Sequence, residues 1–236
     1  MKKLCAVLFA LLAACGGALE IVDTPPIADM YADAYKKIDE KNYEEAANAF
    51  VEIEASYPAG AWAADALVMA AYAQYETGKF ADAIGTIDRF MRFHPGNKNA
   101  AYMLYLRGMC FYRQVSDVRR EPGMSQYALA AFMTLTQRFP DSEYAKNAAN
   151  KIVILKNYIA GKMMYSARRE MSRENWPSAI TDLQKIITQM PETQMAAEAM
   201  FRLNESYRAL GLDDQAAGWA AMLRKNFPDS DWSKKL

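Results

Sequence analysis

Few residues of this chain could form a catalytic or metal-binding group. There is one histidine, His94, and there are three cysteines, Cys5, Cys15 and Cys110. A zinc site, a histidine-based catalytic triad and a disulfide scaffold each need more of these residues. The sequence also contains no Gly-rich phosphate loop, no Gly-x-Ser-x-Gly and no Cys-x-x-Cys motif. We therefore expect no catalytic residue, no cofactor and no metal site.

The thiol of Cys15 is the one group whose surroundings predict a covalent modification. Lys2 and Lys3 precede an apolar run over residues 4–13, which is too short to span a bilayer, and Leu12-Ala13-Ala14-Cys15-Gly16 follows. This segment resembles the lipobox of bacterial lipoproteins. In a lipobox, the small residues before the cysteine let the backbone fit the signal peptidase, and the thiol sulfur of the cysteine carries the diacylglycerol. The alternative is an ordinary secretory signal that happens to contain a cysteine. We expect a signal peptide over 1–14 and a lipidated tether over 15–26.

Lipidation at Cys15 predicts where the protein resides. Several acyl chains on one cysteine anchor a protein stably, at roughly 0.8 kcal/mol per buried CH₂ group. By resemblance to bacterial lipoproteins, Gly16 rather than Asp after the cysteine favours sorting to the outer membrane, with the protein facing the periplasm.

The chain has 28 basic and 28 acidic residues. This balance argues against nucleic acid as a partner, because phosphate binding requires a basic excess.

The remainder of the chain consists of five repeats, each marked by one proline, and successive prolines are 37, 45, 51 and 37 residues apart. When the repeats are aligned on these prolines, residues at three fixed distances before the proline match, and we call these three positions columns. A small Ala stands at −12, and mostly large apolar residues stand at −8 and −5, which is one face of a helix that ends near the proline. The prolines are Pro58, Pro95, Pro140, Pro191 and Pro228. The columns are Ala46, Ala83, Ala128, Ala179 and Ala216; Phe50, Ile87, Phe132, Leu183 and Ala220; and Ile53, Phe90, Leu135, Ile186 and Leu223.

Each repeat has room for a second, earlier helix, with Gly78 and Gly211 at the turn between the two helices. A repeat of thirty-odd residues that contains two helices resembles the tetratricopeptide repeat. We therefore predict an all-α fold, a superhelical array of five tetratricopeptide-like helix hairpins. Eight extra residues in the third repeat are placed in a loop near 117–123, and one long helix is predicted over 143–173 after an N-cap at Asp141 or Ser142. This helix would divide repeats 1–3, residues 27–140, from repeats 4–5, residues 141–236.

By resemblance to the usual geometry of this repeat, residues 27, 23 and 20 before each proline line a groove, with a shift of eight residues in the third repeat for its longer loop. Tyrosines occupy six of the nine positions in the first three repeats and are predicted to form a peptide-binding groove, because Tyr combines a rigid apolar ring with a hydrogen-bonding tip. The alternative is that the rings pack against the next repeat as ordinary core. The predicted groove residues are Tyr31, Tyr35, Tyr72, Tyr75, Tyr105 and Tyr112. In the last two repeats the same positions are mixed, and Arg168, Phe201 and Arg208 are predicted to dock a protein partner.

A lipobox followed by five such repeats resembles the BamD (ComL) family of outer-membrane β-barrel assembly lipoproteins. The most similar segments are residues 87–90 (IDRF), 102–108 (YMLYLRG) and 138–144 (RFPDSEY). The resemblance implies a scaffold that docks on the barrel-forming assembly protein, works beside companion lipoproteins, and receives unfolded outer-membrane proteins through segments that end in an aromatic residue. It also implies substrate binding in the N-terminal half and docking in the C-terminal half.

Two other functions remain open from the sequence. A generic periplasmic repeat lipoprotein could position cell-wall or secretion enzymes with the same fold and the same anchor. A lipid-anchored hydrolase would need a nucleophile and a base placed together, and the sequence offers no such pair.

Overall fold

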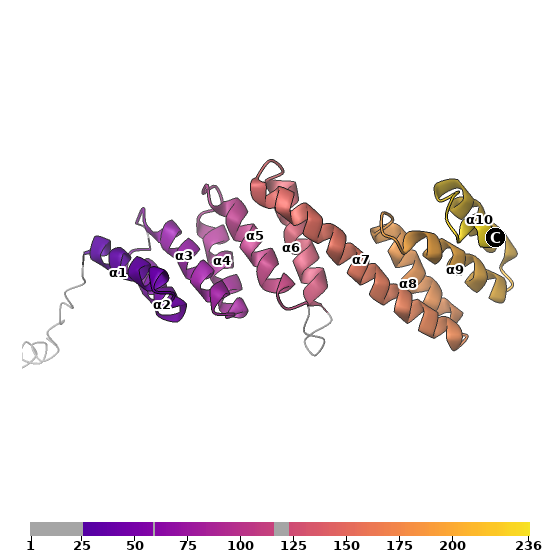
Figure 1. The fold of residues 1–236 in the computed structure, drawn as a ribbon, viewed down its shortest axis with the longest axis horizontal. Coiled ribbons are helices and arrows are strands. Elements are labelled where there is room, and N and C mark those ends of the chain that lie inside the picture. Colours follow the sequence, from indigo (N-terminus) through magenta and orange to yellow (C-terminus); the bar gives the residue numbers. More distant parts are fainter. Residues whose placement is uncertain (1–25, 59, 116–122) are drawn as a thin grey trace, which may run out of the picture.

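The computed structural model describes residues 26–58, 60–115 and 123–236. In these ranges the chain forms ten α-helices and one short 3₁₀ helix, with no strand, and successive helices pair into five hairpins arranged as an elongated, twisting array (Figure 1). This confirms the predicted all-α superhelical array. The helices are α1 (Ile27–Asp39), α2 (Tyr43–Ser56), α3 (Ala63–Glu76), α4 (Phe80–Phe93), α5 (Ala100–Tyr112), α6 (Met124–Arg138), α7 (Glu143–Ser172), α8 (Trp176–Gln189), α9 (Ala196–Ala209), α10 (Asp213–Asn226) and η1 (Ser233–Lys235).

Several predicted features lie outside the described residues. These are the signal peptide, the lipobox with Cys15, the tether up to residue 25 and most of the loop of the third repeat. None of the described helices is long and apolar enough to cross a membrane.

The three sequence columns form the interior of the array. All fifteen side chains are buried, the most exposed being Ala220 at 7%. The Ala column is small enough to let the two helices of a hairpin approach closely, while the larger columns fill the space between them. Each fully buried Phe, Leu or Ile contributes about 1.5–3 kcal/mol through the hydrophobic effect. The second helix of every hairpin ends two residues before its proline, which cannot continue a helix.

The turn inside four of the hairpins uses one left-handed residue, always 17 positions before the proline. Gly78 and Gly211 adopt φ of 74° and 72° there, and Lys41 and Glu174 adopt φ of 59° in the first and fourth hairpins. A side chain in this region costs about 1–2 kcal/mol, a cost that glycine avoids. The third hairpin replaces this turn with the longer connection between α5 and α6, where the eight-residue excess was expected.

The two helices of the third hairpin are in close contact at one glycine and one aromatic ring. Gly108 of α5 faces Phe132 of α6, and a Cβ added at Gly108 would lie 2.4 Å from the Phe132 Cε1 atom. Both residues are buried. The glycine is therefore required by packing, because any larger residue would push the ring out of its place.

The long helix α7 joins the first three hairpins to the last two, and it runs diagonally between them in Figure 1. It begins as predicted, because the Ser142 Oγ atom accepts a hydrogen bond of 3.1 Å from the Ala145 amide. Its first half, including Ala148 and Leu155, packs in one core cluster with α5 and α6. Its second half, including Met164 and Ala167, packs in another cluster with α8 and α9.

Asn204 of α9 stands 24 residues before Pro228, where the first, second and fourth repeats have the buried Ala34, Ala71 and Ala167 and the third repeat has Gly108. The Asn204 side chain is 3% exposed, and its Nδ2 atom donates a hydrogen bond of 2.7 Å to the Ala216 carbonyl oxygen of α10. The buried amide is thus satisfied by the partner helix, so a polar residue is tolerated where the other repeats use Ala or Gly.

Candidate functional site

Two predicted groove tyrosines of α3 are half-buried and lie beside other rings. The Tyr72 ring meets Tyr43 edge-on, with ring centroids 6.0 Å apart. The Tyr75 ring lies 5.8 Å from Phe80, and the Arg113 guanidinium sits 5.6 Å above it. These contacts hold both rings in place while leaving part of each at the surface.

The α5 tyrosines form a similar arrangement against α6 and α7. The Tyr105 ring lies 5.9 Å from Phe132, and its hydroxyl donates a 2.9 Å hydrogen bond to the Asn147 Oδ1 atom. The Lys151 ammonium lies 5.9 Å from the Tyr105 ring and 5.8 Å from the Tyr112 ring. A cation therefore sits over two half-buried rings at this end of the surface.

Tyr31 does not belong to a groove, contrary to the expectation from its position in the repeat. It is 5% exposed, its ring lies 4.7 Å from Trp62, and its hydroxyl donates to the Trp62 carbonyl oxygen at 2.5 Å. This ring instead packs against the segment that leads into the second hairpin. Tyr35, one turn later, remains 42% exposed and contacts Phe50 with its edge.

Two tyrosines that the repeat columns did not select complete the surface. Tyr102 of α5 and Tyr144 of α7 have ring centroids 5.4 Å apart, and Tyr144 is 5.5 Å from Tyr105. Burial raises the pKa of the Tyr102 phenol, and the neighbouring Tyr144 and Tyr72 raise that pKa further. The sequence signal was present, because both tyrosines stand within the segments 102–108 and 138–144. They were missed because they lie outside the −27, −23 and −20 positions.

We call this set the tyrosine cluster: Tyr72, Tyr75, Tyr102, Tyr105, Tyr112 and Tyr144. Burial also raises the pKa of the Tyr72 and Tyr105 phenols. Rigid rings with hydroxyl tips and two flanking cations, Arg113 and Lys151, suit a ligand that has apolar or aromatic side chains and a carboxylate.

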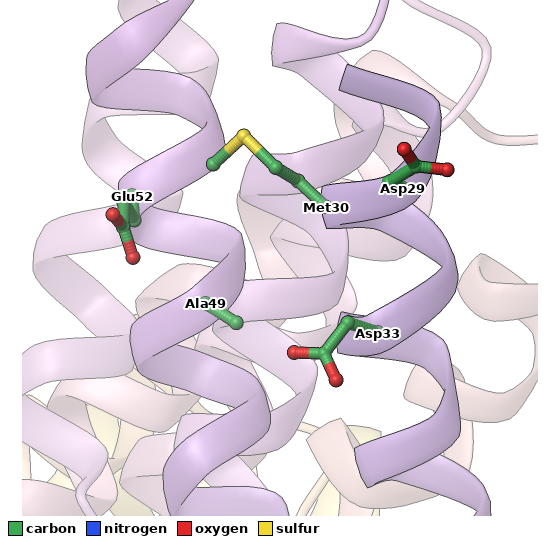
Figure 2. A pocket seen from close by; sticks show the side chains of 5 residues that line it. All are labelled: Asp29, Met30, Asp33, Ala49 and Glu52. Carbon is green, nitrogen blue, oxygen red and sulfur yellow. The ribbon is translucent and has the colours of Figure 1, made fainter. Parts of the chain in front are cut away.

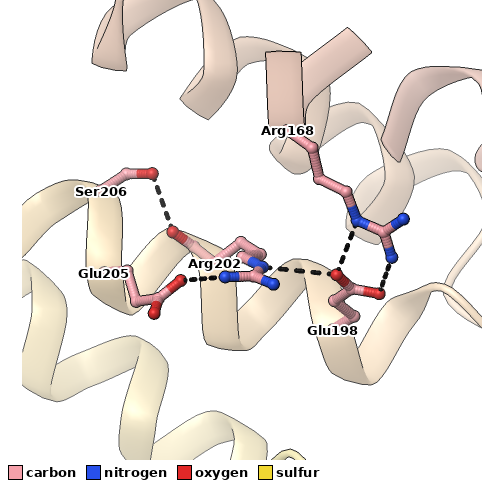
Figure 3. Close-up of polar contacts among 5 residues, drawn as sticks. All are labelled: Arg168, Glu198, Arg202, Glu205 and Ser206. Atoms are coloured by element: carbon pink, nitrogen blue, oxygen red, sulfur yellow. Dashed lines mark hydrogen bonds and ion pairs between the residues drawn. The ribbon is translucent and has the colours of Figure 1, made fainter. Parts of the chain in front are cut away.

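The residues predicted to dock a partner are arranged differently in the last two hairpins. Arg168 of α7 forms a two-pronged ion pair with Glu198 of α9, with one hydrogen bond of 2.9 Å from its Nε atom (Figure 3). Glu198 is 4% exposed and also accepts from Arg202 at 3.3 Å, and Arg202 reaches Glu205 at 2.7 Å. Arg168 thus links two hairpins within the chain, although half of its side chain remains exposed.

The other two predicted docking residues also differ from each other. Phe201 packs against Trp232 at a centroid distance of 5.2 Å and covers the end of the array. Arg208, in the last turn of α9, is exposed. Arg168 and Arg208 are therefore the exposed members of the three predicted docking residues, and Phe201 is partly buried.

Other groups able to do chemistry are accounted for by packing. Burial raises the pKa of the Cys110 thiol to about 12, so this side chain is an unreactive part of the core. The His94 ring lies 5.7 Å from Phe90 at the end of α4. A surface pocket of about 310 Å³ between α1 and α2 is bordered by carboxylates that stand apart around Met30 and Ala49 (Figure 2). Within the described ranges, no group of three or more His, Cys, Asp or Glu residues could hold a metal.

Comparison with known proteins gives a family match over most of the chain. Residues 24–223 match a family model named YfiO and described as an outer membrane lipoprotein. The chain is 34% identical over 212 residues to a Caulobacter vibrioides protein called outer membrane protein assembly factor BamD, covering 90% of this chain and 70% of that protein. Proteins of the same name from Rickettsia prowazekii and Neisseria meningitidis serogroup B are 30% and 31% identical, covering 88% and 89% of this chain and 82% of each relative.

Solved structures with a similar arrangement are more distant. The MamA protein matches with a TM-score of 0.43 and 16% identity, covering 84% of this chain and 90% of that one. The tetratricopeptide domain of P58(IPK) matches with a TM-score of 0.47 and 13% identity, covering 89% of this chain and 53% of that one.

Proposed function

Because this chain belongs to the YfiO family of outer membrane lipoproteins, we propose that it is an assembly factor for outer-membrane β-barrel proteins. The relatives are named assembly factors, and the chain is a non-catalytic protein. Its role is to hold other polypeptides, as a scaffold of the assembly machinery and as a receptor for segments of unfolded outer-membrane proteins. The family match supports the role in assembly, and the tyrosine cluster is the single observation that carries the receptor role.

The tyrosine cluster binds the unfolded substrate. An extended segment that ends in an aromatic residue would place its ring among partly exposed tyrosines and its carboxylate near Lys151 or Arg113. The support is geometric: the Lys151 ammonium lies within 5.9 Å of two tyrosine rings, and the Arg113 guanidinium lies 5.6 Å from a third. Because neighbouring rings already fix these side chains, little conformational entropy is lost when the peptide binds.

The last two hairpins dock the barrel-forming assembly protein, and companion lipoproteins join the same assembly. Arg208 is exposed on α9, and half of the Arg168 side chain is exposed although it is paired with Glu198. This surface is mixed in charge and polarity, as expected for a non-obligate protein interface. The chain itself is held at the periplasmic face of the outer membrane by acyl chains on Cys15.

The substrate role is tested by measuring peptide binding with fluorescence anisotropy. The labelled peptide ends in Phe, and a matched peptide ends in Ser. The double variant Tyr72→Ala/Tyr105→Ala should bind the Phe peptide at least tenfold more weakly than the natural protein, with the Ser peptide weak throughout. The control Tyr127→Ala removes a 53% exposed tyrosine of α6, outside the tyrosine cluster, and should leave binding unchanged. Unaltered affinity in a well-folded double variant would assign these rings to packing alone.

A further inference from the structure

The long helix α7 carries an exposed stripe of its own, separate from the tyrosine cluster. Ile154, Tyr158 and Tyr165 are 55%, 38% and 70% exposed. With Gly161 they are spaced by four, three and four residues, so all four lie on one face of the helix. We call these residues the α7 stripe. Large apolar and aromatic side chains held in water over three turns of a rigid helix are typical of an interaction surface.

Gly161 at the centre of the α7 stripe is not explained by packing within the chain. A Cβ added there would meet nothing within 4 Å, in contrast to Gly108, where a Cβ would collide with Phe132. Gly161 does not have positive φ either. A glycine inside a helix costs about 0.5–1 kcal/mol relative to alanine. A notch without a side chain, between two exposed tyrosines, would let the backbone of another polypeptide come close to α7.

One edge of the α7 stripe is positively charged. Lys151, Lys162 and Arg169 are spaced by 11 and 7 residues and therefore share that edge, with the Lys162 ammonium 4.7 Å from the Tyr158 ring. The helix holds six Lys and Arg residues against two Glu, in a chain of zero net charge. Of the three cations only Arg169 has a carboxylate partner in the described part of the chain, the adjacent Glu170.

The acidic group of α9 that pairs with α7 does not cancel this charge. Glu198 of α9 is buried and already paired with Arg168 and Arg202. The edge is therefore free to attract an acidic ligand, and the exposed rings beside it are free to bury apolar side chains.

From these observations we propose that the α7 stripe is the docking site of an acidic amphipathic helix from a partner protein. The apolar face of that helix packs on Ile154, Tyr158 and Tyr165, and its backbone crosses α7 at the Gly161 notch. Its carboxylates pair with Lys151 and Lys162. A helix fits better than an anionic lipid surface, because lipid headgroups gain nothing from a notch in the helix backbone.

The test uses the full-length lipidated protein in detergent and two designed helical peptides. Both peptides carry the same leucine stripe; one has Glu and the other Lys at the flanking positions. The Glu peptide should bind at least tenfold more tightly than the Lys peptide, and the double variant Lys151→Glu/Lys162→Glu should abolish or reverse this preference. Equal binding of the two peptides, or no binding of the Glu peptide, would overturn the proposal.

Gly161 supplies the decisive variants. Gly161→Leu should weaken binding of the Glu peptide at least tenfold without lowering the melting temperature. The matched control is Gly85→Leu, at an exposed glycine of α4 where a Cβ also meets nothing within 4 Å. Unchanged binding by Gly161→Leu would refute docking at the notch. Binding to anionic vesicles that falls in Lys151→Glu/Lys162→Glu, without a preference between the peptides, would assign the surface to lipid instead. Because Lys151 also faces the tyrosine cluster, the separate readout is taken with Gly161→Leu, which alters neither that cluster nor its cations and should leave capture of the Phe-ended peptide unchanged.

Discussion

The contact between Gly108 and Phe132 gives the sharpest prediction about how the repeats pack. In Gly108→Ala the new methyl group would lie 2.4, 2.6 and 2.9 Å from three atoms of the Phe132 ring. Ordinary carbon contacts begin near 3.4 Å, so the ring or the helix must move by close to an ångström. Phe132 is fully buried and cannot move into solvent. Overpacking of this kind costs about 1–3 kcal/mol, while alanine in place of a helical glycine returns about 0.5–1 kcal/mol.

We therefore expect Gly108→Ala to destabilise the protein by about 1–2 kcal/mol, which lowers the melting temperature by roughly 2–8 °C in a chain of this length. Gly85→Ala is the matched control, because an added Cβ there meets nothing within 4 Å. It should stabilise the protein by about 0.5–1 kcal/mol. The assay is thermal unfolding followed by circular dichroism, with urea unfolding as a second measure.

A second variant tests whether the clash is the cause. Phe132→Leu removes the ring atoms that the new methyl group would strike, so the effect of Gly108→Ala should be much smaller in the Phe132→Leu background. Residues in direct contact show such coupling of about 0.5–3 kcal/mol. If Gly108→Ala stabilises the protein as Gly85→Ala does, or if the two effects at Gly108 and Phe132 simply add, the packing of the third hairpin is not as described.

Three further predictions concern the anchor, the turns and the buried thiol. Cys15→Ser should leave the protein without acyl chains, and mass spectrometry that still finds them would contradict the lipobox. At the left-handed turn position, Lys41→Gly should raise stability by about 0.5–1 kcal/mol and Gly78→Ala should lower it by about 1 kcal/mol; unfolding curves that shift in the same direction for both would refute the turn geometry. The Cys110 thiol, with its pKa raised to about 12 by burial, should resist alkylation at pH 8 in the folded protein and react once urea unfolds the chain; rapid alkylation of the folded protein would contradict its burial.

Much of the fold could be predicted from the sequence because helix-ending prolines and buried apolar residues recur at the same spacing in every repeat. Proline ends each second helix, and the columns at −12, −8 and −5 are fully determined by packing, so their burial follows from spacing alone. The long helix was predicted to within one residue, because Ser142 is a good N-cap and no proline interrupts the chain before Trp176. The family resemblance is confirmed by the match over residues 24–223.

Other features could not be predicted because they depend on contacts between repeats. Tyr31 occupies a groove position by spacing, yet it is buried because the first hairpin leaves room for its ring against Trp62. Lys41 and Glu174 adopt the left-handed turn that their residue types do not signal, since the packing of the two helices imposes it. Tyr144 belongs to the first turn of α7 and joins the tyrosine cluster only after the long helix has folded back against α5.

The proposed function requires that the tyrosine cluster receives unfolded outer-membrane proteins in the cell. The most direct measurement places a photo-reactive amino acid at position 72 or 105, with position 85 on α4 as the control, and crosslinks intact cells during a pulse of labelled protein synthesis. We expect adducts with newly made outer-membrane β-barrel proteins from positions 72 and 105, and none from position 85. Equal adducts from all three positions, or none from the tyrosine cluster while the protein is correctly anchored and folded, would contradict it.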